Sequence, residues 1–173
     1  MLALLCSLLL AVPDAEELRR IDDYSGQAND LWTAAGVQPL PEATSGRELR
    51  VWAGGGVTGL WTGWIVTPTR ISVYSNEIVV DGVHRPGDAY GRVYSQRRSD
   101  ARGILRQFAE FAALNGSSVT CRVHDGTGYL IEGRYDGSYF AFYAGNPKLC
   151  DAPHAKEVAE ALNLLWNVRE DAR

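Results

Sequence analysis

The stretch GYLIEGRYDGSYFAFY, residues 128–143, decides the fold of this 173-residue chain. Large apolar or aromatic residues recur at every second position on both sides of Asp136-Gly137, at Tyr129 and Ile131 and at Phe140 and Phe142, and Asp-Gly is typical of a two-residue type I′ turn. Because such a turn fixes the register, Ile131 must face Phe142 across the hairpin. The stretch therefore predicts an antiparallel hairpin with one apolar face and one mixed face.

The residues before this hairpin predict a third strand beside it. Residues 119–123 alternate between apolar and polar side chains, and the following Asp125-Gly126-Thr127 is typical of a short loop. We therefore expect Cys121 to face Ile131 within a three-stranded meander. Its inward face carries Val119, Cys121, Val123, Tyr129, Ile131, Phe140 and Phe142.

A second meander is predicted closer to the N-terminus. The segments LRVWAGG, LWTGWIVT and RISVYS are rich in aromatic and β-branched residues and are separated by glycines and by Thr67-Pro68-Thr69. Residues 78–80 and 89–95 predict one or two further strands, with residues 81–88, DGVHRPGD, as a loop between them. We expect this meander to start near residue 49.

Helical spacing of apolar residues predicts two firm helices and one weaker helix. One begins at Ser99 or Asp100 and ends at Asn115-Gly116, and another begins after Asp151; residues 16–35 predict a loosely amphipathic helix bent near Gly26. The apolar stripes of the two firm helices contain Ile104, Leu105, Phe108, Phe111, Ala112 and Leu114, and Val158, Ala161, Leu162, Leu165 and Trp166. The expected fold is α+β: an antiparallel sheet built from two β-meanders, packed on one face by two helices.

The chain divides into three parts. Residues 1–15 contain an apolar run typical of a signal peptide, residues 16–46 form the weak helix and a linker, and residues 47–173 form a single α+β domain. Without the leader, Cys121 and Cys150 are the two remaining cysteines, and such a pair in an exported chain predicts a disulfide. Lipid anchoring at Cys6, a buried apolar N-terminal segment and free thiols in a cytosolic chain are the alternatives.

Several functional classes are disfavoured by composition and motifs. The formal net charge of −4, with mixed signs along the chain, does not suit nucleic acid. The glycines of AGGGVTG, residues 53–59, match G-x-G-x-x-G, but residues 60–68 disfavour the helix that a dinucleotide site requires. The kinase form of the motif needs a lysine on a following strand, and the first lysine is Lys148. We expect no cofactor. We also expect no metal site, because the three histidines, His84, His124 and His154, are far apart in the sequence.

The outward face of the 119–143 meander is the candidate binding surface. Its charged groups and aromatic rings suit recognition of a protein or of an acidic or sugar-like ligand. The alternative is a solvated sheet face whose cross-strand pairs serve only solubility. The members of this face are Arg122, His124, Glu132, Arg134, Tyr139 and Tyr143. Trp61 and Trp64 form a second candidate, because a hairpin with tryptophans on both faces exposes one ring unless another element covers it.

These observations favour a small periplasmic or secreted binding domain without catalytic activity, a class that includes inhibitors and immunity proteins. Its partner would be a protein of the cell envelope, and its mature form would have no membrane span; the oligomeric state is left open. The first alternative is a small enzyme that draws an acid and a base from His124, Glu132, Asp125 and His84. The second is a structural subunit.

Overall fold

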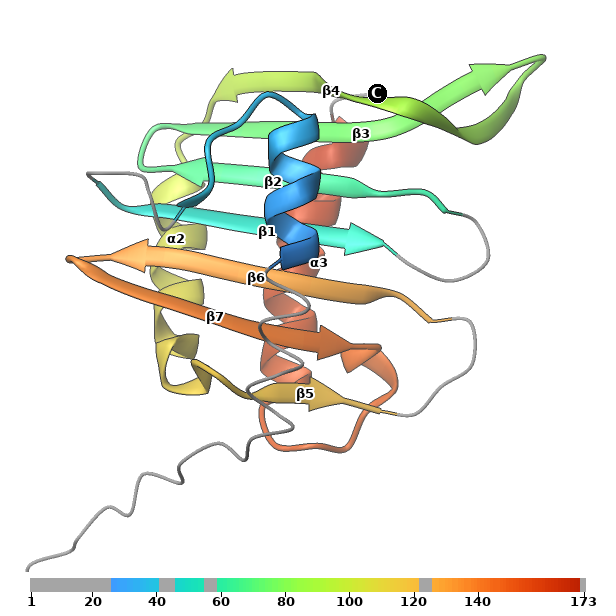
Figure 1. Cartoon of the computed structure of the whole chain (residues 1–173). Coiled ribbons are helices and arrows are strands. Elements are labelled where there is room, and N and C mark those ends of the chain that lie inside the picture. Colours follow the sequence, from blue (N-terminus) through green and yellow to red (C-terminus); the bar gives the residue numbers. More distant parts are fainter. Residues whose placement is uncertain (1–25, 41–45, 55–58, 122–125, 172–173) are drawn as a thin grey trace, which may run out of the picture.

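The structure is a computed structural model, which describes residues 26–40, 46–54, 59–121 and 126–171. Its centre is a seven-stranded sheet in the order β4-β3-β2-β1-β6-β7-β5 (Figure 1). The strands are β1 (Glu48–Gly54), β2 (Thr62–Thr67), β3 (Arg70–Val80), β4 (Val83–Arg97), β5 (Ser118–Thr120), β6 (Gly128–Tyr135) and β7 (Ser138–Gly145). All neighbours are antiparallel except β5 and β7, which are parallel.

Helices cover both faces of the sheet. The helices α2 (Ala101–Ala109) and α3 (Ala155–Asp171) lie on one face, and a short N-terminal helix, residues 26–34, crosses the other face (Figure 1). Two short 3-10 helices, η3 (Glu110–Leu114) and η4 (Pro147–Leu149), follow α2 and precede α3 respectively. The α+β class, with two helices on one face and a weaker N-terminal helix, is confirmed.

The β6–β7 hairpin has the predicted turn and register. Asp136 and Gly137 have φ angles of 49° and 85°, as both central residues of a type I′ turn require. Ile131 lies opposite Phe142. The local sequence therefore settles this hairpin without help from the rest of the chain.

The predicted position of the third strand in this half is wrong. Cys121 does not face Ile131, because β1 occupies that side of β6 and pairs Val51 with Ile131. β5 instead lies at the sheet edge beside β7, where the Cys121 N–H donates to the Gly145 carbonyl at 3.2 Å. β1 forms a longer ladder with β6 and therefore takes the position next to it in the sheet. Residues 122–125 lie outside the described residues.

The predicted loop at residues 81–88 is also wrong. Asp81 and Gly82, with φ angles of 53° and 75°, form a two-residue turn, and β4 begins at Val83 directly after it. β3 and β4 pair along their full length, with irregularities between Val73 and Tyr74 and again between Ser75 and Glu77.

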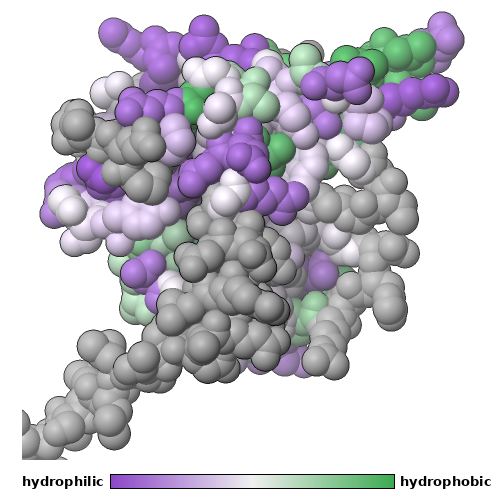
Figure 2. Space-filling model, in the orientation of Figure 1, coloured by the Kyte–Doolittle hydropathy of each residue, from purple (hydrophilic) through white to green (hydrophobic). Residues whose placement is uncertain are grey.

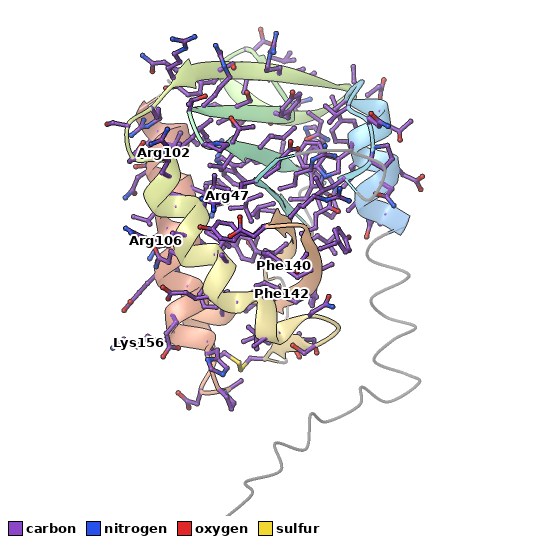
Figure 3. The ribbon with its side chains drawn as sticks, turned by 90° about the vertical axis from the view of Figure 1, so that its left-hand side faces the viewer. Arg47, Arg102, Arg106, Phe140, Phe142 and Lys156 are labelled. Carbon is purple, nitrogen blue, oxygen red and sulfur yellow. A yellow bond between two sulfur atoms is a disulfide. The ribbon has the colours of Figure 1, made fainter. Side chains whose placement is uncertain are left out.

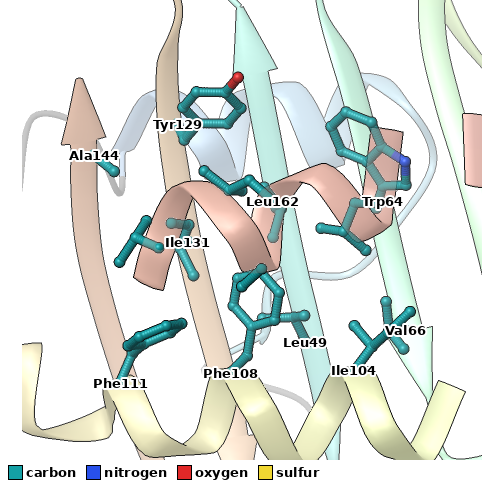
Figure 4. Packing of buried hydrophobic residues seen from close by; sticks show 14 of the residues in the cluster. Leu49, Trp64, Val66, Ile104, Phe108, Phe111, Tyr129, Ile131, Ala144 and Leu162 are labelled. Carbon is teal, nitrogen blue, oxygen red and sulfur yellow. The ribbon is translucent and has the colours of Figure 1, made fainter. Parts of the chain in front are cut away.

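The main core lies between the sheet and the helices α2 and α3 (Figure 4). From the C-terminal half of the sheet it contains the predicted inward residues Val119, Tyr129, Ile131, Phe140 and Phe142, and from the N-terminal half Leu49, Val51, Trp64, Val66, Ile71 and Val73. From the helices it contains the predicted residues Ile104, Leu105, Phe108, Phe111, Val158, Ala161, Leu162 and Leu165. Burying each large apolar side chain contributes about 1.5–3 kcal/mol. This layer holds both halves of the sheet together.

A second, smaller core lies under the N-terminal helix. Trp32 is fully buried there and packs against Trp52 in a tilted arrangement, at 4.3 Å between ring centroids, with Tyr74 edge-on at 5.6 Å. Because an isolated helix this short is marginal in water, contacts of this kind are needed to hold it. Ala28 and Leu31 of the same helix are buried in this core as well, so Trp32 fixes the N-terminal helix to the sheet together with these two residues.

The C-terminal helix starts later than predicted. α3 begins at Ala155 rather than just after Asp151, because His154 has a φ of 64° and interrupts any earlier helical turn. The predicted disulfide is confirmed: Cys121 and Cys150 are bonded, with 5.3 Å between their Cα atoms. The bond joins the end of β5 to the segment that leads into α3.

Candidate functional site

The N-terminal helix lies over the sheet face that the sequence predicts as a binding surface. Glu132 is 6% exposed, and Tyr143 packs against the cluster around Trp32 and Trp52. Tyr139 and Arg134 are half-buried on the same side of the hairpin. Arg122 and His124 lie outside the described residues. The centre of the predicted surface is therefore occupied by the protein's own helix.

A buried carboxylate forms the polar centre of this contact. Trp32 Nε1 donates to Glu132 Oε1 and the Tyr139 hydroxyl donates to Glu132 Oε2, both at 3.1 Å. Arg50 lies beside them, with its guanidinium 5.6 Å from the Trp32 ring centre. Arg50 is held in place by Glu48 at 2.6 Å and by the Gln38 carbonyl at 2.6 Å.

Burial has the largest effect on the pKa values of Glu132 and Tyr139. It raises the pKa of Glu132, and the charge of Arg50 and the two hydrogen bonds offset the rise only in part. Burial also raises the pKa of Tyr139, and the nearby charge of Glu132 adds to that effect. Every polar atom of the Glu132 carboxylate has a partner, so the group fastens the helix to the sheet.

The two tryptophans of the second candidate lie on different faces. Trp64 is fully buried in the main core, edge-on to Trp166 at 4.9 Å between ring centroids. Trp61 is half-buried beside the Trp32 cluster, and its ring lies so close to Gly54 that a Cβ there would be 2.1 Å from it. The glycine of AGGGVTG at position 54 thus makes room for a ring.

The residues of the enzyme alternative do not converge in the described structure. His124 and Asp125 lie outside the described residues. Across the sheet, Glu132 of β6 lines up with Ser72 of β3, because β1 and β2 between them are paired in that register. His84 of β4 lies opposite Val79, which is seven residues beyond Ser72 along β3. The strand spacing and rise place Glu132 and His84 on the order of 30 Å apart.

A group of exposed apolar side chains lies elsewhere, on the β3–β4 hairpin. The first residue of β2, Thr62, lies opposite Ser75. Residues 76–90 of β3 and β4 therefore extend beyond β2 as a two-stranded ribbon, here called the β-arm (Figure 1). Figure 2 shows hydrophobic residues gathered along this arm. They are Ile78, Val79, Val80 and Val83, which are 46%, 61%, 42% and 51% exposed.

Glu77 fixes the base of the β-arm to the rest of the fold. One of its carboxylate oxygens accepts from Arg169 of α3 at 2.6 Å, and the other pairs with His84 Nδ1 at 2.6 Å. Asn76 adds two contacts, because its side chain accepts from the Trp61 N–H at 2.8 Å and donates to the Gly59 carbonyl at 3.1 Å. An isolated two-stranded ribbon is marginally stable, so these contacts position the arm.

Sequence reasoning missed this surface, although a signal was present. The apolar run at residues 78–80 is followed directly by Asp81-Gly82 and another valine, the same pattern that identified the β6–β7 turn. His84, Pro86 and Gly87 instead suggested a loop. Pro86 is tolerated because β4 is an edge strand.

Two further features bear on the class of site. Within the part of the chain that the structure describes, no helix combines the length and the apolar character that crossing a membrane demands. In the same residues, no three His, Cys, Asp or Glu side chains come together as metal ligands would.

The chain matches no protein-family model, and no curated protein matches it.

Proposed function

We propose that the chain is an exported, non-catalytic domain that binds a protein partner through the β-arm. The observation that carries the proposal is the exposure of Ile78, Val79, Val80 and Val83 on one projecting hairpin. Contiguous exposed apolar residues of this kind mark protein interaction sites in soluble domains. The arm presents these side chains on both of its faces, because Val79 points to one face of the strand and its neighbours Ile78 and Val80 point to the other.

The edge position of β4 supports the same proposal. β4 is the outermost strand of the sheet order, and Val93 on it is also exposed. Within the described residues no strand lies outside β4, so its outer backbone groups are available for pairing. An extended segment of a partner can add to such an edge by main-chain hydrogen bonds, while apolar side chains supply specificity.

The fixed base of the arm favours tight binding. Ordering a loose hairpin on association would cost free energy, and anchoring by Glu77 and Asn76 avoids much of that cost. A stiff projecting hairpin can enter a cleft of a partner and block it. This suits an inhibitor or immunity-type protein, which acts by occlusion.

Export is supported by the disulfide. A bond between Cys121 and Cys150 persists in an oxidising compartment such as the periplasm or the outside of the cell. The apolar run near the start of the sequence agrees with that location. Mass spectrometry of the chain isolated from the exported fraction tests this part, and a retained residue 1 with two free thiols would contradict it.

The partner-binding part is tested by capture with matched variants. The full chain is immobilised and used to recover a partner from the exported fraction of the source cells. Val79→Asp combined with Val80→Asp should abolish recovery, whereas Leu149→Asp should retain it, because Leu149 is an equally apolar side chain, 68% exposed, far from the arm.

A second pair of variants distinguishes the arm from the sheet face. Arg134→Ala combined with Tyr139→Ala should leave recovery of the same partner unchanged. Loss of the partner in that double variant, with retention in the arm variant, would show that the sheet face is the binding surface. Recovery of no partner by the unmodified chain would also contradict the proposal.

A further inference from the structure

A cationic cavity lies at the end of the sheet opposite the β-arm, beside α2. Its volume is about 250 Å³. Its walls come from the residue before β1, the β2–β3 turn, the end of β6 and α2; they include Arg47, Pro68, Arg102, Leu105, Arg106 and Tyr135. Figure 3 shows Arg47 between the sheet and α2, on the same side of the molecule as Arg102 and Arg106.

The arginines of this cavity are neutralised only in part. Arg47 is paired with Asp136 at 2.8 Å and lies over the Tyr135 ring at 4.4 Å from its centre. Arg102 and Arg106 form no ion pair with any other residue that the structure describes. Three arginines and one carboxylate leave the cavity a formal charge of +2.

The local sequence of α2 disfavours the charge of Arg102 when no anion is present. Arg102 lies in the first turn, where the helix dipole disfavours a positive charge, and that turn has no acidic residue. Arg106 lies in the last turn, where the dipole favours its charge, but it follows Arg102 at i+4, the spacing at which like charges on a helix repel. Asp100 does not compensate, because its carboxylate binds Arg98 at 2.9 and 3.0 Å and makes no cap hydrogen bond.

The geometry points to this cavity as a binding site for a small phosphomonoester. At neutral pH such a group carries a charge between about −1.5 and −2, which matches the +2 of the cavity. Guanidinium forks on α2 suit its oxygens, which accept paired hydrogen bonds. The side chains of Leu105 and Pro68 and the Tyr135 ring give an apolar wall for the organic part of the ligand.

The size of the cavity restricts the ligand further. Small-molecule sites usually measure about 300–1,000 Å³, so a cavity of about 250 Å³ takes a compact molecule. A single phosphoryl group with one ring fits this description better than a nucleotide. The site is independent of the β-arm, which lies at the other end of the strands (Figure 1).

The test is isothermal titration of the full chain at neutral pH and low salt with phenyl phosphate, benzoate and phenol. Phenyl phosphate should bind at least tenfold more tightly than benzoate, which carries one charge, and phenol should not bind. Arg102→Gln and Arg106→Gln should each weaken phenyl phosphate binding at least tenfold. Thermal melting of each variant checks that both keep the fold, as expected for exposed side chains.

The matched control is Arg92→Gln, which removes the same charge from an exposed position on β4 away from the cavity. It should change the affinity less than twofold. Equal weakening by Arg92→Gln and Arg102→Gln would show only a general attraction of anions and would overturn the site. Absence of phenyl phosphate binding, or equal affinity for benzoate, would overturn it as well.

Discussion

The indole N–H of Trp32 donates a hydrogen bond to the carboxylate of Glu132 at 3.1 Å, joining residues 100 positions apart in the sequence. This bond fixes the N-terminal helix over the sheet face that carries Glu132, Tyr139 and Tyr143. A face that its own chain covers is a poor first contact for a partner. The exposed β-arm is therefore the surface on which the proposed function rests.

Replacing Glu132 by glutamine should change how stability depends on pH. Burial raises the folded-state pKa of Glu132 above its ordinary value near 4.5, so the folded protein binds this proton more tightly than the unfolded chain does. The stabilisation from this group is fully present below the ordinary pKa and is lost as pH rises through the raised pKa. Glutamine does not titrate, so the free energy of unfolding of wild type relative to Glu132→Gln should fall between acid and neutral pH.

Urea unfolding at a series of pH values measures this difference. The m-value should be the same in the two proteins, so that the two free energies are comparable. A difference that stays constant, or one that grows as pH rises, would mean that the charged carboxylate is favoured in the fold and that burial does not dominate.

Replacing Trp32 by alanine should lower the free energy of unfolding by about 3–5 kcal/mol. The fully buried ring packs against Trp52, and its loss leaves a cavity between helix and sheet. Fluorescence should also report greater exposure of the remaining tryptophans. A loss below about 1 kcal/mol, without a fluorescence change, would show that the helix does not depend on this side chain.

Replacing Gly63 by alanine should destabilise the protein by about 1–3 kcal/mol. A Cβ at this position would lie 2.7 Å from the buried Trp52 ring, which the N-terminal helix prevents from moving away. Gly91→Ala is the matched control in a strand, because nothing lies within 4 Å of a Cβ there. Chemical denaturation of both variants checks the prediction, and equal effects would refute the close contact with Trp52.

Replacing both Cys121 and Cys150 by serine should cost about 3–4 kcal/mol, as expected for a closed loop of 29 residues. The bond pins β5, a three-residue edge strand, to the start of the C-terminal segment. A reducing agent should destabilise wild type by a similar amount and leave the serine variant unchanged. An effect of the reducing agent on the serine variant would point to another cause.

The sequence predicted the parts of the fold that depend on local chemistry. Asp136-Gly137 specifies its own turn, and the apolar spacing around Phe108 and Leu162 specifies each helix and its buried side. The place of β5 depends on competition between strands, since β1 pairs with seven residues of β6. Residues 119–121 carry no local signal that distinguishes β6 from β7 as neighbour.

The candidate site was harder to predict for a related reason. The alternation that placed Glu132 and Tyr139 on the outward face is correct, but the sequence does not show that residues 26–34 return to cover that face. The β-arm was missed because Pro86 and Gly87 resemble a loop, although an edge strand accepts both. The cationic cavity joins Arg47 to Arg102, and only the folded chain brings them together.

The most direct test of the central claim is photo-crosslinking from the β-arm. A benzophenone amino acid replaces Val79 in one version of the full chain and Leu149 in another, since both side chains are exposed. Illumination in the exported fraction of the source cells should give one crosslinked protein from position 79 and none from position 149. Equal crosslinking from both positions, or none from position 79, would contradict the claim that the arm binds a partner.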